Sequence, residues 1–201
     1  AQRSSYSEGN TIVFDWNTGT AYVDPANAML TFDVELTTTG PDAAEAFDFG
    51  SGAGACYLIE EIRIISKNGS EIDRIQNANI LAKVLTDWTY DQEGHNYLQM
   101  ALKDHAFAAP ATGTTRVVIP LKVISGFFRP TVRDMLIPAG LASGLRIEIT
   151  LATAARALNQ TAGAGTAPTY TITDPEMLMM LHDLNDPTQA VLVDESTKGG
   201  L

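Results

Sequence analysis

The sequence predicts an all-β antiparallel sandwich, and three observations support that fold class. Two segments, residues 30–37 and 145–151, alternate between apolar and polar side chains. A period of two places alternate side chains on opposite faces of a strand, so each segment predicts a strand with one buried face. One further stretch, residues 80–88, has the spacing of an amphipathic helix. Because helices do not recur between the strands, the pattern argues against a parallel α/β sheet.

Weaker strand and turn signals continue along the whole chain. Asn68 and Gly69 form a strong hairpin signal, because both residue types tolerate positive φ. Pro120 cannot donate to a strand ladder and predicts an edge, a bulge or a bend, and Pro175 predicts a bulge in the last strand. Residues 177–182 alone would also fit a helix. These signals together predict eight strands, at residues 12–16, 30–37, 57–66, 71–75, 97–102, 117–124, 145–151 and 170–184.

Segments without strand periodicity divide the chain. Residues 1–10 are polar and predict an N-terminal arm, whereas residues 185–201 predict a C-terminal tail or linker. One domain is expected between them, over residues 11–184, and its length suits a single all-β sandwich. Residues 38–55 and 159–168 are rich in glycine and are expected to form long loops, the first of them mobile. Eight strands with long connections are typical of a jelly roll.

One short helix is expected after the fourth strand, with Asn77 or Asn79 as its cap. Its apolar stripe consists of Ile80, Leu81, Val84, Leu85 and Trp88. We expect this stripe, including Trp88, to pack into the core. In the strand that precedes the helix, Ile72 is expected to face inward.

The charge and the cysteine content restrict the partners. The formal net charge is −11 and the 13 Lys and Arg residues are scattered, so the field of the protein repels nucleic acid and anionic lipid. We therefore expect no direct nucleic-acid binding. The single cysteine, Cys56, has apolar neighbours and predicts a buried thiol in a reducing compartment. No apolar run approaches the ~18 residues of a membrane span.

Catalytic and metal-binding signals are weak. The three histidines, His95, His105 and His182, lie in separate segments without the spacing of metal ligands, and no nucleophile elbow accompanies them. We therefore predict that the protein is not an enzyme and that it has no cofactor. Asp183, Asn185 and Asp186 offer oxygen ligands for Ca²⁺, but their spacing is not that of an EF-hand and an Asx-type turn explains them better.

A bulky corner follows the strand that contains Pro120. Phe127 and Phe128 are adjacent on a bend, so both rings are not expected to face one core. One ring is a candidate anchor between subunits, because aromatic residues are enriched at interface centres. Packing of both rings beneath the loop is an equal alternative. With the nearby cations, the candidate intersubunit contacts are Phe127, Phe128, Arg129 and Arg133.

The order of these motifs resembles the first jelly roll of a major capsid protein of the double jelly-roll virus lineage, which includes large eukaryotic DNA viruses, virophages and adenovirus. The similarity rests on residues 22–34, the hairpin over residues 58–73, the segment from Ile119 to Phe128, the strand over residues 144–149 and residues 170–173. A double jelly roll needs about twice this length. The chain is therefore expected to be either a first domain or a single jelly-roll relative.

The resemblance implies a structural coat protein that forms capsomers of an icosahedral shell, as trimers or as hexameric and pentameric rings. It implies contacts with other capsid proteins, and an internal membrane or minor proteins as further partners. The implied location is the virion, after assembly in the host cytoplasm or nucleus. A carbohydrate-binding jelly-roll module is the alternative function; it would require exposed aromatic rings on a sheet face, whereas Trp16 and Trp88 lie in distant segments.

Overall fold

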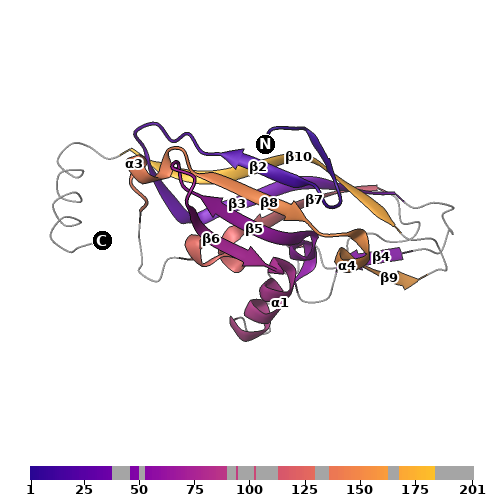
Figure 1. The fold of residues 1–201 in the computed structure, drawn as a ribbon. Helices are drawn as coiled ribbons and strands as arrows, with labels where there is room; N and C mark the ends of the chain where they lie inside the picture. Colours follow the sequence, from indigo (N-terminus) through magenta and orange to yellow (C-terminus); the bar gives the residue numbers. More distant parts are fainter. Residues whose placement is uncertain are drawn as a thin grey trace.

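The computed structural model describes residues 1–37, 46–49, 53–89, 94, 102, 113–129, 136–162 and 168–183. Two four-stranded sheets form the body of the molecule, and their long strands run along its length (Figure 1). All strand pairs are antiparallel. The predicted all-β antiparallel sandwich is therefore confirmed.

The first sheet is built around a pair of long strands. In spatial order it contains β1 (Ser5–Ser7), β10 (Thr169–His182), β3 (Tyr22–Thr37) and β7 (Gly113–Pro120). The predicted bulge at Pro175 is confirmed, since the register of β10 against β3 shifts between Thr173 and Glu176. Pro120 is the last residue of β7, which is an edge strand, so it interrupts no interior ladder.

The second sheet contains the hairpin predicted at Asn68 and Gly69. Its spatial order is β2 (Thr11–Asp15), β8 (Arg146–Leu151), β5 (Ile59–Ile65) and β6 (Glu71–Gln76). The turn between β5 and β6 places Gly69 at a φ of +82°, which glycine adopts without steric cost. The helix α1 (Ala78–Thr89) follows β6 directly, as expected for the helix after this hairpin.

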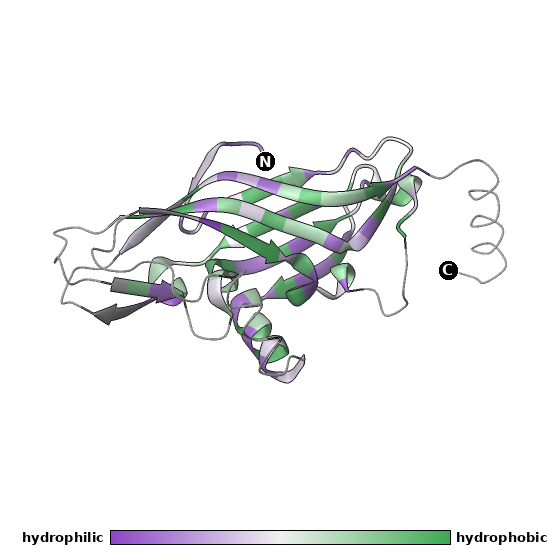
Figure 2. Cartoon of the chain, turned by 180° about the vertical axis from the view of Figure 1, so that it is seen from behind, coloured by the Kyte–Doolittle hydropathy of each residue, from purple (hydrophilic) through white to green (hydrophobic). Residues whose placement is uncertain are grey.

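Apolar side chains from the facing surfaces of the two sheets form the core. Leu30, Phe32 and Val34 of β3 are fully buried, as are Ile147 and Ile149 of β8. These are the residues that strand alternation predicts to point inward. Figure 2 shows the apolar residues of the long strands recurring along the faces of the sheets.

Tyr170 links the core of β10 to the end of β8. Its ring is buried and its hydroxyl donates a hydrogen bond to the carbonyl oxygen of Ala152. Burial raises the pKa of Tyr170, so the hydroxyl stays protonated and remains a donor. The strand β10 is thus fixed near its beginning by packing and by a buried hydrogen bond.

Several expectations about loops were wrong. Residues 5–7 of the expected arm form β1, in which Tyr6 is buried. The two segments expected as loops contribute β4 (Ala46–Phe49) and β9 (Leu158–Ala162), which pair as a small sheet at one end of the body. In β4, Phe47 and Phe49 are buried, so this short strand is held by core packing despite its glycine-rich flanks. The described part of the chain therefore contains ten strands, not eight.

The boundaries of two other predicted strands differ from the observed ones by a few residues. Residues 57 and 58 belong to a 3₁₀ helix, η1 (Gly54–Leu58), so the third predicted strand begins at Ile59 as β5. Leu121 and Val123 are buried as predicted, but in the 3₁₀ helix η2 (Leu121–Val123) rather than in a strand. Most of the strand predicted at residues 97–102, and the tail over residues 185–201, lie outside the described residues. Cys56 is buried, as predicted.

We predict that replacing Ile147 by alanine lowers the free energy of unfolding by about 2–5 kcal/mol, because it removes a fully buried side chain between β2 and β5. Thr150→Ala is the matched control on the opposite face of β8 and should cost less than about 1 kcal/mol. Urea denaturation of both variants measures the difference. Equal losses would show that the two faces of β8 are not distinguished by burial.

Candidate subunit interface

The corner that contains Phe127 and Phe128 is the 3₁₀ helix η3 (Gly126–Phe128). Ser125 caps it, because its side-chain oxygen accepts a hydrogen bond from the backbone N–H of Phe127 at 3.2 Å. The same hydroxyl donates to Oδ2 of Asp73 at 2.9 Å. The corner is therefore tied to β6.

The two phenylalanine rings have different environments. Phe128 has 0% exposure and its ring lies 6.2 Å from the ring of Trp16, centroid to centroid. Phe127 meets Phe128 edge to face, with 5.2 Å between the centroids, and is only partly buried. Adjacent residues thus point to different places, as expected from the bend. Phe128 is enclosed within the domain, so Phe127 is the ring that a partner protein would reach.

Phe127 lines an apolar groove of about 440 Å³ between η3, β6 and α1. The lining residues are Ile72, Asp73, Ile75, Leu81, Leu85, Ile124, Gly126 and Phe127. The expectation that Ile72 faces the core is wrong: its side chain is half exposed, at 50%. β6 is the edge strand of the second sheet, and the side chain of Ile72 belongs to the groove instead.

The helix α1 turns a different face to the core from the one its apolar stripe predicts. Its buried residues are Ala78, Asn79, Ala82 and Thr86. The small side chains let α1 lie close to η1 and β5, against which it packs. Thr86 satisfies its buried hydroxyl by donating to the carbonyl oxygen of Ala82 at 2.7 Å.

The larger apolar residues of α1 consequently face outward. Trp88 is 86% exposed and Ile80 is 53% exposed, and Val84 lies between them on the same helical face. The prediction that Trp88 belongs to the core is therefore wrong. The residues at positions 78, 82 and 86 repeat with the same spacing as those at 80, 84 and 88, so two competing faces were present in the sequence. Close packing selected the small residues.

Together the groove and the helix form one apolar surface, which we call the α1–β6 surface. Its members are Ile72, Leu81, Leu85 and Phe127 in the groove and Ile80, Val84 and Trp88 on the helix. Figures 1 and 2 show that α1 projects from the body of the sandwich. A contiguous exposed apolar surface on a folded domain is typical of a protein interface.

Of the two arginines predicted as intersubunit contacts, the structure describes only Arg129. Arg129 follows η3 and is exposed, and it is not one of the described residues that line the groove. Arg133 lies outside the described residues. On the helix, Lys83 and Asp87 form an ion pair of 3.0 Å one turn apart. Exposed pairs of this kind contribute little to stability, and they give the surface a polar margin.

Other chemical candidates form no site among the described residues. No group of three His, Cys, Asp or Glu side chains there could hold a metal ion. His182 is described, whereas His95, His105, Asn185 and Asp186 lie outside the described residues. None of the described helices is long and apolar enough to span a membrane. Trp16 is buried and Trp88 is on a helix, so neither tryptophan offers an aromatic platform on a sheet face.

Comparison with known proteins identifies the fold. No family model and no curated protein matches this sequence. The chain is similar in structure to PBCV-1 VP54, a double jelly-roll major capsid protein whose crystal structure was fitted into a cryo-electron-microscopy reconstruction of the virophage Sputnik. The TM-score is 0.52, with 14% sequence identity over 92% of this chain. The fold is a jelly roll.

The match has a limited extent. This chain spans 41% of the length of the PBCV-1 VP54 chain. At 14% identity the similarity concerns the path of the backbone, and the side chains of the α1–β6 surface are properties of this sequence.

We predict that Trp88→Ala changes the free energy of unfolding of the monomer by less than about 0.5 kcal/mol, because the side chain is exposed. Phe128→Ala should cost about 3–5 kcal/mol, because it empties a fully buried site. Thermal and urea unfolding at low protein concentration measure both values. A large loss from Trp88→Ala in monomeric protein would place that ring in the core after all.

Proposed function

We propose that this protein is a viral capsid protein, a structural subunit that joins further copies of itself into the capsomers of an icosahedral shell. The observation that carries the proposal is the exposed α1–β6 surface on a jelly-roll body. A shell subunit needs a rigid sandwich and at least one adhesive surface that stays exposed in the free subunit. The similarity in fold to a double jelly-roll capsid protein supports the same assignment.

Trp88 is the strongest candidate anchor of such an interface. Burial of a tryptophan removes roughly 150–250 Å² from water, which at ~25 cal/mol per Å² corresponds to about 4–6 kcal/mol before the entropic costs of association. Phe127 lies in the neighbouring groove and is held by the Ser125 cap. An exposed aromatic beside a preformed apolar groove is the arrangement found at interface hot spots.

The chemistry of the groove favours a structural role over a catalytic one. Among the described residues that line the groove, Asp73 is the single ionisable one, and its carboxylate accepts a hydrogen bond from Ser125. That arrangement offers neither a nucleophile with its base nor a pair of carboxylates.

The partners in this proposal are other subunits. The net charge of −11 opposes contact with nucleic acid, so genome retention is assigned to minor proteins or an internal membrane. Capsomers would be trimers if a second jelly roll accompanies this one, and hexameric or pentameric rings if each subunit contributes one. Other capsid proteins are further partners, and the proposed location is the virion after assembly in the host cytoplasm or nucleus.

We predict that the purified protein forms an oligomer of defined mass and that Trp88→Ala weakens this oligomer at least about tenfold, because the anchor is lost. Adding Phe127→Ala should weaken it further. Size-exclusion chromatography with light scattering over a concentration series measures the masses.

Leu141→Ala is the matched control. Leu141 is a large apolar residue, 65% exposed, on α3 (Ala139–Ala142), and it does not belong to the α1–β6 surface. Its removal should leave the oligomer unchanged. A wild-type protein that stays monomeric at every concentration, or an equal effect of Leu141→Ala, would contradict the proposal.

A further inference from the structure

Within the described part of the chain, the second half of β10 has a strand neighbour on one side only. β1 pairs with residues 171–173, and the last backbone hydrogen bond on that side is donated by Asp174 to the carbonyl of Ser4 at 2.9 Å. From Glu176 to His182, the described residues supply pairing from β3 alone. This leaves an open edge of seven residues, about 24 Å long at ~3.4 Å per residue.

The open edge has no proline, and no charged residue between its two ends, to protect it against pairing. Natural edge strands are blocked by charges, by proline or by bulges. β6, an edge of the second sheet, carries Glu71, Asp73 and Arg74. The first register shift of β10 against β3 ends before the open segment, whereas the second lies within it, between Leu178 and Met180. There residues 25–28 of β3 stand opposite Met179 alone, so the additional residues belong to β3 and not to the open edge. Within that segment the side chains are apolar except at its two ends. Leu178, Met180 and Leu181 are each about half exposed.

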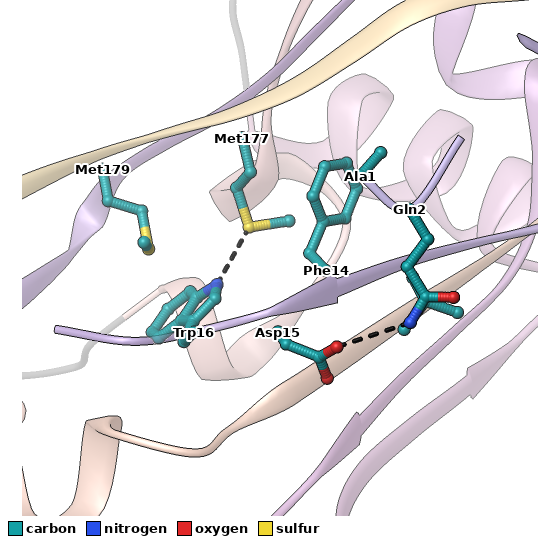
Figure 3. A pocket seen from close by; sticks show the side chains of 8 residues that line it. Ala1, Gln2, Phe14, Asp15, Trp16, Met177 and Met179 are labelled. Atoms are coloured by element: carbon teal, nitrogen blue, oxygen red, sulfur yellow. Dashed lines mark hydrogen bonds between the residues drawn. The ribbon is translucent and has the colours of Figure 1, made fainter. Parts of the chain in front are cut away.

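The inner side of this half strand is anchored to the second sheet. Figure 3 shows Met177 and Met179 directed toward Trp16, across a slot of about 270 Å³ between β10 and β2. The indole Nε1 of Trp16 donates to the sulfur of Met177 at 3.2 Å. The open edge is therefore held extended by packing on its inner side, so a partner strand would meet an ordered template.

The sequence of the open segment is self-complementary in one register. In an antiparallel pair, directly opposed residues point to the same face of the sheet. Two copies of one segment can therefore pair symmetrically only if a central residue lies opposite the same residue of the other copy. Pro175 and the end of β10 at His182 bound the segment, which places Met179 at the centre. Glu176 then faces His182 of the second copy, and Leu178 faces Met180.

The opposed side chains in this register are compatible in kind, and Glu176 also lies 3.4 Å from Arg116 of its own chain. An imidazole N–H can donate to the Glu176 carboxylate in either protonation state of His182. The inner positions pair apolar side chains, including Met177 with Leu181, and cross-strand apolar pairs stabilise sheets. Shifting the centre to Leu178 would instead place Glu176 opposite Met180 and would draw Asp174 into the pairing, where φ is +47° and the strand bulges.

We propose that residues 176–182 of β10 form a two-fold symmetric contact with the same residues of a second copy of this chain, joining the two first sheets into one continuous sheet. The contact involves β10 rather than the α1–β6 surface and does not depend on the function proposed above. Seven residues a side make a small interface, and two subunits of net charge −11 repel each other. The contact is therefore weak in dilute solution and strengthens with salt, which screens the repulsion.

Disulfide trapping tests the register directly. In the proposed pair the two Met179 residues face each other, with Cα atoms about 4.5–5.5 Å apart, a separation that a disulfide spans. Met179→Cys should form a covalent dimer under mild oxidation. In the matched control Leu181→Cys, the two cysteines would lie about 14 Å apart, four residues out of register, so the control should react at least about tenfold more slowly. Cys56 is buried and gives little background.

The experiment is carried out in the Trp88→Ala protein, so that contacts through the α1–β6 surface do not bring the cysteines together. A Met179→Cys dimer that forms faster than the Leu181→Cys control, and faster at higher salt, supports the proposal. This holds whether or not the α1–β6 surface proves to be an interface. Equal rates for the two variants, or no dimer from Met179→Cys, would overturn it. A dimer that appears only after removal of residues 184–201 would assign the edge to the chain's own tail and would also overturn it.

Discussion

The antiparallel pairing of β3 with β10 is the interaction on which the rest of the fold depends. The two strands contain 16 and 14 residues, and their register runs from Thr37 opposite Thr169 to Tyr22 opposite His182. β7 pairs with the free side of β3 and β1 with part of β10, so the whole first sheet is assembled on this pair. The inward side chains of the pair form one wall of the core, and its bulges absorb Pro25 and Pro175 without ending either strand.

The parts of the fold that alternation or turn chemistry determines could be predicted from the sequence. β8, the second half of β3 and the β5–β6 hairpin fall in this class, because a period of two or a glycine turn leaves few alternatives. β4 and β9 could not be recognised in this way, since each is short and is stabilised by pairing with a partner more than 100 residues away. The prediction of which face of α1 is buried failed for a different reason. Its sequence contains two faces whose residues repeat with the same spacing, one of small residues and one of large apolar residues. Packing against η1 and β5 buries the face of small residues.

The candidate interface stays a prediction, and the sequence alone suggested only its centre, the corner with Phe127 and Phe128. The bend at η3 separates Phe127 from Phe128, as two adjacent rings on a corner require, but the surrounding groove depends on how β6 and α1 are placed. The described residues thus present two apolar surfaces of different kinds. The α1–β6 surface presents side chains, whereas the open edge of β10 presents backbone groups. Both surfaces belong to a protein with a net charge of −11, which opposes contact until screening or other interactions bring subunits together.

We propose that this jelly roll is a building block of a symmetric shell. Negative-stain electron microscopy of the purified protein, at a concentration and salt that favour association, tests this claim most directly. The account predicts closed particles of regular outline, either trimers with a pseudo-hexagonal profile, rings of five or six subunits, or complete shells. A field of single subunits that persists as concentration and salt are raised would contradict it.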